Sequence, residues 1–242
     1  MLQSVIDKVT DVLYPKACPI CGKAAPVVEG KRAQVCPECY EELRFIKHNY
    51  CLRCGKELGS AAQQYCYDCS RIKHVYDQGA AALMYTDGIK QSIYRYKYKG
   101  KREYASWYGA MLAKGCGERI AMWNPDVIIP VPLHKKKLKE RGYNQAELMA
   151  RALGEQLGIP VDGDYLVRTN NTVPMKKLTG EERINNLKNA FNIVSNSVQY
   201  NKILLVDDIY TTGATIDACA TVLKAHGAKS VYYVSLCVGK GI

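Results

Sequence analysis

The chain has 242 residues, of which 48% are hydrophobic, so it is not intrinsically disordered and can build one sizeable core plus a smaller module. Lys and Arg number 34 against 23 Asp and Glu, which gives a formal charge of +11. This positive charge favours polyanionic partners, namely phosphate esters, nucleic acid or an anionic membrane surface, without choosing among them.

The first 14 residues, MLQSVIDKVTDVLY, carry apolar residues at helical spacing between charges. This pattern predicts an amphipathic helix rather than a signal peptide. No apolar run approaches the roughly 20 residues that span a bilayer, so we expect a protein that is not integral to the membrane. The expected location is the reducing cytoplasm, with peripheral contact at the inner face of the membrane left open.

Eight of the 11 cysteines form four Cys-x-x-Cys pairs: Cys18/Cys21, Cys36/Cys39, Cys51/Cys54 and Cys66/Cys69. Two thiolates at this spacing grip one face of a tetrahedral ion, and a second pair closes the other face. Because this stretch has little core of its own, we expect two structural zinc sites. Redox-active thiols and iron–sulfur ligation are the weaker alternatives.

The order of pairing at the two zinc sites is left open by the spacing. Sequential pairing places the first two pairs at one zinc and the last two at the other, whereas a cross-braced order alternates them. Gly22 and Gly55 each follow a pair and can take the positive φ that a ribbon turn requires. Closed four-thiolate sites of this kind act as scaffold or docking surface rather than as catalysts.

The pattern changes after residue 70, and we place the domain boundary between residues 1–74 and residues 75–242. Strands are expected over residues 79–85, 127–131, 202–206 and 230–238, and helices over residues 107–122, 144–157 and 215–226. Gly227 supplies the stop of the last helix. Strands that alternate with helices predict an α/β fold, a mainly parallel sheet flanked by helices, with ligands at the carboxyl ends of its strands.

The stretch ILLVDDIYTTGAT, residues 203–215, sets two carboxylates at the end of such a strand. The loop that follows leads into a helix, so its backbone N–H groups and hydroxyls can cradle a phosphate monoester. Asp207 and Asp208 can accept hydrogen bonds from vicinal ribose hydroxyls or stand near Mg²⁺. The candidate binding residues are Asp207, Asp208, Thr211, Thr212, Gly213, Ala214 and Thr215.

This stretch resembles the signature of type I phosphoribosyltransferases, which bind phosphoribosyl pyrophosphate (PRPP). Residues 129–154, IPVPLHKKKLKERGYNQAELMARALG, and the paired zinc ribbons resemble the ComF family of competence proteins and their GntX-like relatives. The resemblance implies a type I phosphoribosyltransferase fold that binds PRPP with Mg²⁺. It also implies a pyrophosphate loop formed by Pro132, Leu133, His134, Arg141, Gly142 and Asn144.

Three features of this resemblance limit what it implies. A solvated surface explains the lysines of residues 135–139 as well as phosphate binding does. For His134, a place on the surface or in the core is favoured over a role as a base. The mobile loop of the family corresponds to residues 172–191, with Arg183 and Asn186 as its site residues, but Met175 replaces the usual glutamine. Thr211 stands where purine-salvage members carry an acid, which argues against purine salvage.

Residues 92–104, SIYRYKYKGKREY, interleave aromatic rings with cations. Such a pattern suits single-stranded nucleic acid, because bases stack on rings while cations follow the phosphates. The candidates are Tyr96, Lys97, Tyr98, Lys99, Lys101 and Arg102. The alternative is an ordinary amphipathic helix end, because Ile89, Ile93 and Lys97 follow helical spacing.

Two functions from different classes follow. In the first, a ComF-type protein handles incoming single-stranded DNA in natural transformation, with helicase or DNA-processing proteins of the competence machinery as partners. In the second, the chain is an active phosphoribosyltransferase that uses Asp207 and Asp208 in catalysis and releases pyrophosphate from PRPP. The remaining cysteines, Cys116, Cys219 and Cys237, are expected to be buried apolar residues.

Overall fold

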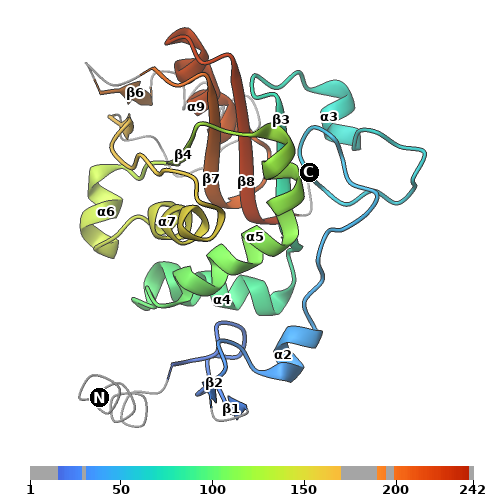
Figure 1. The fold of residues 1–242 in the computed structure, drawn as a ribbon, viewed down its shortest axis with the longest axis vertical. Coiled ribbons are helices and arrows are strands. Elements are labelled where there is room, and N and C mark those ends of the chain that lie inside the picture. Colours follow the sequence, from blue (N-terminus) through green and yellow to red (C-terminus); the bar gives the residue numbers. More distant parts are fainter. Residues whose placement is uncertain (1–15, 29–30, 170–189, 195–198, 240–242) are drawn as a thin grey trace.

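A computed structural model describes residues 16–28, 31–169, 190–194 and 199–239 (Figure 1). The expected N-terminal helix and the loop residues Met175, Arg183 and Asn186 lie outside the described residues.

A four-stranded parallel sheet forms the centre of the molecule. Its strands are β3 (Gln78–Met84), β8 (Ser230–Val238), β7 (Lys202–Tyr210) and β4 (Val127–Pro130), in that spatial order. The strands are almost continuous apolar runs, as expected for a sheet that is covered on both faces. The predicted α/β architecture with a mainly parallel sheet is confirmed.

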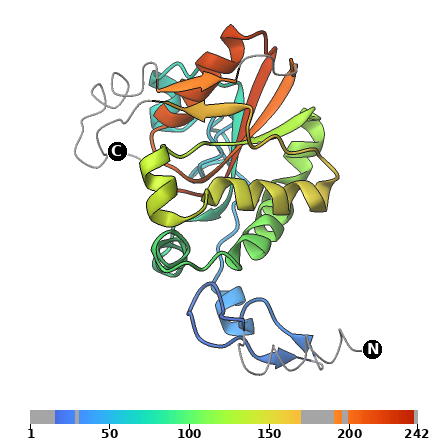
Figure 2. The same cartoon turned by 90° about the vertical axis from the view of Figure 1, so that its left-hand side faces the viewer.

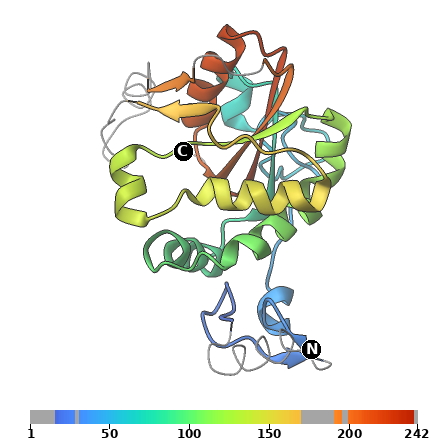
Figure 3. The same cartoon turned by 60° about the vertical axis from the view of Figure 1, so that its left-hand side comes forward.

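Alternate residues of β7 point into two separate cores. Leu204 and Val206 pack with α4 (Asp87–Tyr98), α5 (Tyr104–Trp123) and α7 (Gln145–Leu157) on one face. Ile203 and Leu205 pack on the other face with α9 (Ala214–Ala225). Figure 3 shows α7 crossing in front of the sheet, with the α4 and α5 helices next to it.

The three remaining cysteines lie in these cores. Cys116 and Cys237 belong to the core under α5 and α7, and Cys219 belongs to the core under α9, all of them buried as expected. Burial raises the pKa of the Cys116 thiol to about 12. These thiols therefore act as small apolar side chains.

One strand runs further than the sequence predicts. β7 was expected to end at Val206, but it continues to Tyr210 because β8 still pairs with it, with Asp207 opposite Ser235. β4 ends at Pro130, opposite Val206. The two aspartates therefore lie within a strand, at the place where β4 leaves one edge of β7 uncovered.

The helix boundaries follow from local capping. Asn144 begins α7, because its side-chain oxygen accepts a hydrogen bond from the Ala146 N–H at 3.1 Å. Gly227, with a φ of 96°, follows the end of α9 as predicted. The sequence did not predict the short helix α6 (Lys135–Arg141) or the antiparallel pair β5 (Leu166–Arg168) and β6 (Phe191–Ile193), which packs against α9 (Figure 2).

The two cysteine-rich modules attach at different places. The first contains β1 (Val27–Val28), β2 (Lys31–Arg32) and α2 (Pro37–Glu41) and extends from one end of the molecule, below α4 (Figures 1 and 2). Arg95 of α4 holds it by donating to the carbonyls of Pro19 and Ile20, at 3.0 and 2.5 Å.

The second module, which contains α3 (Tyr67–Arg71), packs directly on the sheet beside β3. Tyr233 of β8 donates its hydroxyl hydrogen bond to the Cys54 carbonyl at 2.7 Å. Gly55, with a φ of 70°, approaches β3 so closely that a Cβ there would lie 2.6 Å from the Cα of Ala80. This module is therefore part of the core of the sheet.

Candidate functional site

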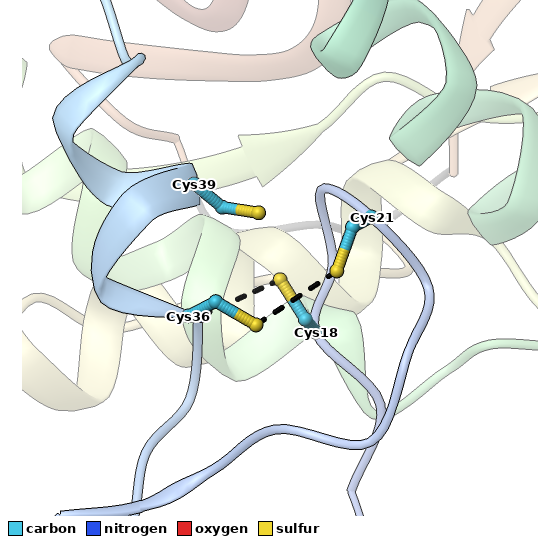
Figure 4. A group of neighbouring side chains, drawn as sticks. All are labelled: Cys18, Cys21, Cys36 and Cys39. Atoms are coloured by element: carbon cyan, nitrogen blue, oxygen red, sulfur yellow. Dashed lines mark hydrogen bonds between the residues drawn. The ribbon is translucent and has the colours of Figure 1, made fainter.

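The eight paired cysteines form two groups in sequential order. Cys18, Cys21, Cys36 and Cys39 make one group (Figure 4), and Cys51, Cys54, Cys66 and Cys69 make the other, with all four ligand atoms of each group within 4.8 Å of one another. The first two Cys-x-x-Cys pairs therefore share one site and the last two share the other, so the order is sequential and not cross-braced.

The sulfur spacing in both groups fits zinc. Four thiolates at about 2.3 Å from a tetrahedral zinc lie about 3.8 Å from one another. The Sγ atoms of Cys21 and Cys36 are 3.8 Å apart, and those of Cys54 and Cys66 are 3.7 Å apart. Gly22 and Gly55 take the positive φ expected after each first pair, 79° and 70°. The chemistry and geometry of both groups are those of a closed structural zinc site.

A polar cavity of about 200 Å³ opens at the carboxyl ends of β4 and β7. It is lined by Lys97, Val131, Pro132, Leu133, Lys137, Arg141, Asn144, Gln145, Ala146, Arg168, Asp207, Asp208 and Thr215. The structure thus brings together four residues of the expected pyrophosphate loop, both aspartates and one threonine of the phosphate cradle.

Two residues of the expected pyrophosphate loop have capping roles instead of lining the cavity. The Nδ1 atom of His134 accepts a hydrogen bond from the Lys136 N–H at 3.2 Å and begins α6, so this side chain is occupied as an N-cap. Gly142, with a φ of 77°, ends the same helix. Both residues therefore shape the loop.

A smaller cavity of about 30 Å³ adjoins the first one. Its lining is the segment after the acid pair, namely Asp207, Ile209, Tyr210, Thr211, Thr212, Gly213, Ala214, Thr215 and Ile216. Gly213, with a φ of 81°, is the N-cap of α9, so the loop presents backbone N–H groups and the positive end of a helix. This cradle has room for a small anionic group and can stabilise its charge.

A lysine from α4 reaches the acid pair. The Nζ atom of Lys97 lies 2.5 Å from Oδ2 of Asp208, and the Asp208 N–H donates to Oδ1 of Asp207 at 2.8 Å. Burial raises the pKa of Asp207 to about 7, and the neighbouring Asp208 carboxylate is the second largest cause. Burial alone would lower the pKa of Lys97, but Asp208 and Asp207 raise it overall, so this ammonium stays charged.

Three more cations surround the cavity. Burial lowers the pKa of Lys137 and that of Arg168, and neighbouring cations add to the effect on Lys137. Arg141 donates from Nη1 to Oε1 of Gln145 at 2.8 Å and from Nη2 to the Tyr98 hydroxyl at 3.3 Å. The cavity therefore gathers four cations against two carboxylates, which favours an anionic ligand.

Sequence reasoning missed several residues of this cavity. Gln145 lies within residues 129–154, but the resemblance did not indicate it as a site residue. It is buried and accepts a hydrogen bond from Arg141. Lys137 belongs to the lysine run and is exposed like Lys135, Lys136 and Lys139, as the solvated alternative expects, but it also lines the cavity. Arg168 ends the short strand β5, which no pattern in the sequence indicated.

Residues 92–104, the segment of alternating aromatic and cationic residues, lie partly in the core and partly on the surface. Its helical alternative is confirmed, because α4 runs to Tyr98. The nucleic-acid prediction is wrong for Tyr96, which is completely buried and donates its hydroxyl hydrogen bond to the Gln145 carbonyl at 3.0 Å. Lys97 is engaged with Asp208 instead of facing solvent.

The rest of this segment forms an exposed patch. Tyr94 and Tyr98 are 49% and 59% exposed, and their ring centroids are 5.3 Å apart. Lys99 and Arg102 are exposed near the same end of α4, and Lys101 is half-exposed. We call Tyr94, Tyr98, Lys99, Lys101 and Arg102 the α4 patch. Tyr98 connects it to the cavity through Arg141.

The second cysteine module and the segment that directly follows it, residues 74–76, also contact the phosphate cradle. The Nδ1 atom of His74 lies 2.7 Å from Oδ2 of Asp217, in the first turn of α9, and the Val75 N–H donates to Oδ1 of the same carboxylate at 2.7 Å. The hydroxyls of Tyr76 and Tyr210 are 2.7 Å apart. A small cavity between the module and the loop is lined by Cys54, Cys66, Cys69, Thr211 and Thr212, among others.

The raised pKa of Asp207 predicts a pH dependence of stability. The folded-state pKa of about 7 lies above the ordinary 3.8, so the folded chain binds more protons between these values. The contribution of Asp207 to the free energy of unfolding therefore falls as pH rises from about 4 to about 7. Urea unfolding of the parent and of Asp207→Asn at about pH 5 and about pH 8 checks this. We expect the parent to lose stability relative to the variant at the higher pH, and an unchanged difference contradicts it.

Comparison with known families matches both parts of the chain. Residues 9–70 match the double zinc ribbon domain, and residues 110–241 match the phosphoribosyl transferase domain. Within the described residues, no helix combines the length and apolar character needed to cross a membrane.

The curated relatives are named for competence or for DNA utilization. The chain is 37% identical over 109 residues to competence protein F of Haemophilus influenzae, covering 44% of this chain and 48% of that protein. It is 31% identical over 153 residues to competence protein ComFC of Bacillus subtilis, covering 62% and 59%. It is 31% identical over 156 residues to the DNA utilization protein YhgH of Escherichia coli K12, covering 63% and 68%. The alignments with the two competence proteins thus span about half of each relative.

Among solved structures, a purine phosphoribosyltransferase from Pyrococcus horikoshii is 18% identical, with a TM-score of 0.35, over 56% of this chain and 87% of that one. An adenine phosphoribosyltransferase is 14% identical, with a TM-score of 0.37, over 62% and 76%.

Proposed function

Because the chain belongs to the ComF family, in which a double zinc ribbon precedes a phosphoribosyltransferase domain, we propose that it binds PRPP or a related sugar phosphate and handles single-stranded DNA during DNA uptake. The observation that carries the first part is the polar cavity, where a phosphate cradle, two carboxylates and four cations meet.

Each part of the cavity suits one part of a phosphorylated sugar. The cradle of Thr211, Thr212 and Gly213 would receive the 5-phosphate through its N–H groups and hydroxyls. Asp207 and Asp208 would accept hydrogen bonds from the vicinal ribose hydroxyls. Arg141, with its planar guanidinium held by Gln145, would bind the pyrophosphate in two contacts. The ligand would then span from α9 to α6.

Mg²⁺ bound together with PRPP would neutralise the pyrophosphate group. The carboxylates available to hold it in this cavity are those of Asp207 and Asp208. Asp208, however, already pairs with Lys97 at 2.5 Å. The donor set therefore does not fit a tight protein-bound magnesium site, and the metal would be held chiefly by the oxygens of PRPP.

The α4 patch supports the DNA-handling part of the proposal. Its two exposed rings can stack on bases, and its cations can follow the phosphates. The nearest link to the cavity is Arg141, which contacts Tyr98. The names of the curated relatives, competence protein and DNA utilization protein, agree with a DNA partner.

Replacing the exposed part of the patch is expected to weaken DNA binding. Base stacking contributes about 1–3 kcal/mol per base, so Tyr98→Ala should lower the affinity for a single-stranded oligonucleotide by about tenfold. Neutralising Lys99, Lys101 and Arg102 should also reduce the slope of affinity against salt. Fluorescence anisotropy at several salt concentrations measures both quantities.

The control for this experiment is Met122→Ala. Met122 is 72% exposed on α5, outside the α4 patch, so its replacement should leave oligonucleotide binding unchanged. If the parent does not bind the oligonucleotide, or if its affinity does not depend on salt, the DNA part of the proposal is wrong.

The partners and location follow from the same reasoning. We propose that the protein acts in the cytoplasm, peripheral to the inner face of the membrane, where incoming single-stranded DNA meets helicase or DNA-processing proteins of the competence machinery. Pull-down of a tagged chain from competent cells, with and without nuclease, tests whether any such partner is bound directly or through DNA.

An active phosphoribosyltransferase is the second candidate function. The observation in its favour is the placement of Lys137, Arg141 and Arg168 around one cavity, where they would stabilise a departing pyrophosphate. Asp207 and Asp208 would then take part in catalysis through the sugar hydroxyls. Thr211 supplies a hydroxyl where an acid would assist a purine, so acceptors other than purines should be included. Pyrophosphate release with any base, amine or oligonucleotide, lost in Asp207→Asn/Asp208→Asn, would establish turnover.

A further inference from the structure

The ion pair between Lys97 and Asp208 places a protein cation where a divalent metal would meet the acid pair. Lys97 comes from the last turn of α4, far in sequence from β7, and its side chain is only 20% exposed. Its Nζ atom lies 2.5 Å from Oδ2 of Asp208. The Asp208 side chain is itself 10% exposed. This contact is therefore a buried ion pair in the wall of the cavity.

Asp208 is buried and Asp207 is half-buried, and two adjacent carboxylates repel each other, so a nearby cation stabilises them. The Asp208 N–H supplies Asp207 with one hydrogen bond at 2.8 Å, but a hydrogen bond does not cancel two charges. The ammonium of Lys97 is the group that pairs directly with one of them. Other cations of the cavity, Lys137 and Arg141, lie on α6 and remain available to the ligand.

We propose that Lys97 is the resident counter-ion of the acid pair and makes the binding of a 5-phosphorylated sugar independent of divalent metal. This inference rests on the proposed sugar phosphate function and adds to it a positioning residue. Lys97 holds the Asp208 carboxylate in place through the ion pair at 2.5 Å, so that the carboxylate pair can accept the sugar hydroxyls without Mg²⁺.

The test uses ribose 5-phosphate, which carries no pyrophosphate and so brings no metal with it. Its dissociation constant is measured by isothermal titration calorimetry with the full zinc-loaded chain, once in a buffer freed of divalent metal by ion exchange before the protein is added and once in excess MgCl₂. The proposal predicts that the two constants agree within about twofold. A parent that binds only with Mg²⁺ overturns the inference and leaves the proposed function standing. A parent that binds under neither condition overturns both.

Variants of Lys97 test whether its ammonium group is what makes binding independent of Mg²⁺. Lys97→Met should weaken binding without metal by about tenfold or more, because the acid pair loses its charged partner. Mg²⁺ should restore part of that loss, and Lys97→Arg should bind as the parent does. The matched control is Lys90→Met, on the exposed side of the same helix. If Lys97→Met binds like the parent in the buffer without Mg²⁺, the inference is wrong. If this variant does not fold, a parent that binds only with Mg²⁺ still overturns the inference.

Discussion

Replacing Cys69 by serine is expected to abolish sugar phosphate binding, whereas replacing Cys39 by serine leaves that binding intact. The two cysteines occupy the same position in their groups, each in a short helix that follows the third ligand. Either replacement opens one four-cysteine site, and a structural zinc contributes about 10–16 kcal/mol to the folding of its module. The zinc content should fall from about two to about one per chain in both variants.

The difference between the variants lies in what each module supports. The segment that directly follows the second module, residues 74–76, is joined to the phosphate cradle through His74 and Asp217, at 2.7 Å, and through the hydroxyls of Tyr76 and Tyr210, also at 2.7 Å. The first module is held through the carbonyls of Pro19 and Ile20 by Arg95, on α4. Loss of the second zinc should therefore release Thr211 and Thr212 from their support, since both line the cavity shared with Cys69.

Titration with ribose 5-phosphate, with zinc content and circular dichroism measured on the same samples, checks this prediction. The Cys39→Ser variant is the control for general loss of a zinc module. Equal affinity in both variants would show that the second module does not position the phosphate cradle.

Replacing Gly213 by alanine is expected to produce the second large effect, a loss of sugar phosphate binding of more than about a hundredfold. Gly213 has a φ of 81°, which costs a residue with a Cβ about 1–2 kcal/mol. A Cβ there would also lie 2.5 Å from the Tyr210 hydroxyl and 3.0 Å from Cε1 of His74. The cradle must move to accommodate it, and several backbone contacts to one phosphate would then be lost together.

Gly158 provides the matched control for Gly213. It has a φ of 68° at the end of α7, and no atom lies within 4 Å of its Cβ position. Gly158→Ala should therefore cost about 1–2 kcal/mol of stability and leave binding unchanged. Chemical denaturation and calorimetry separate the two effects. Similar binding by both variants would contradict the close packing inferred at the cradle.

The parallel sheet and its helices could be predicted from the sequence because their apolar runs and caps are local signals. β8 coincides with the predicted strand over residues 230–238, and Asn144 and Gly227 mark helix ends as predicted. The extension of β7 to Tyr210 could not be predicted, because it depends on how far β8 continues beside it. Strand length in a sheet is a property of both partners.

The candidate site was predictable in part for the same reason. The acid pair and the cradle are contiguous in sequence, so one motif reveals them, and the Cys-x-x-Cys spacing revealed both zinc groups. Lys97 could not be placed, because the spacing that predicts α4 does not say which strand end the helix approaches. For Tyr96, alternation of aromatic and cationic residues suggested a surface, whereas helical periodicity buries that ring and exposes Tyr98.

The most direct test of the account is the thermal shift caused by PRPP with Mg²⁺ in the zinc-loaded parent and in Asp207→Asn/Asp208→Asn. A ligand at about 100 times its dissociation constant stabilises the folded state by about 2.7 kcal/mol, which raises the Tm of a chain of this size by about 5–10 °C. We expect that shift in the parent and its loss in the variant. A parent whose Tm does not respond to PRPP, or a variant that responds as the parent does, would contradict the claim that this cavity binds a sugar phosphate.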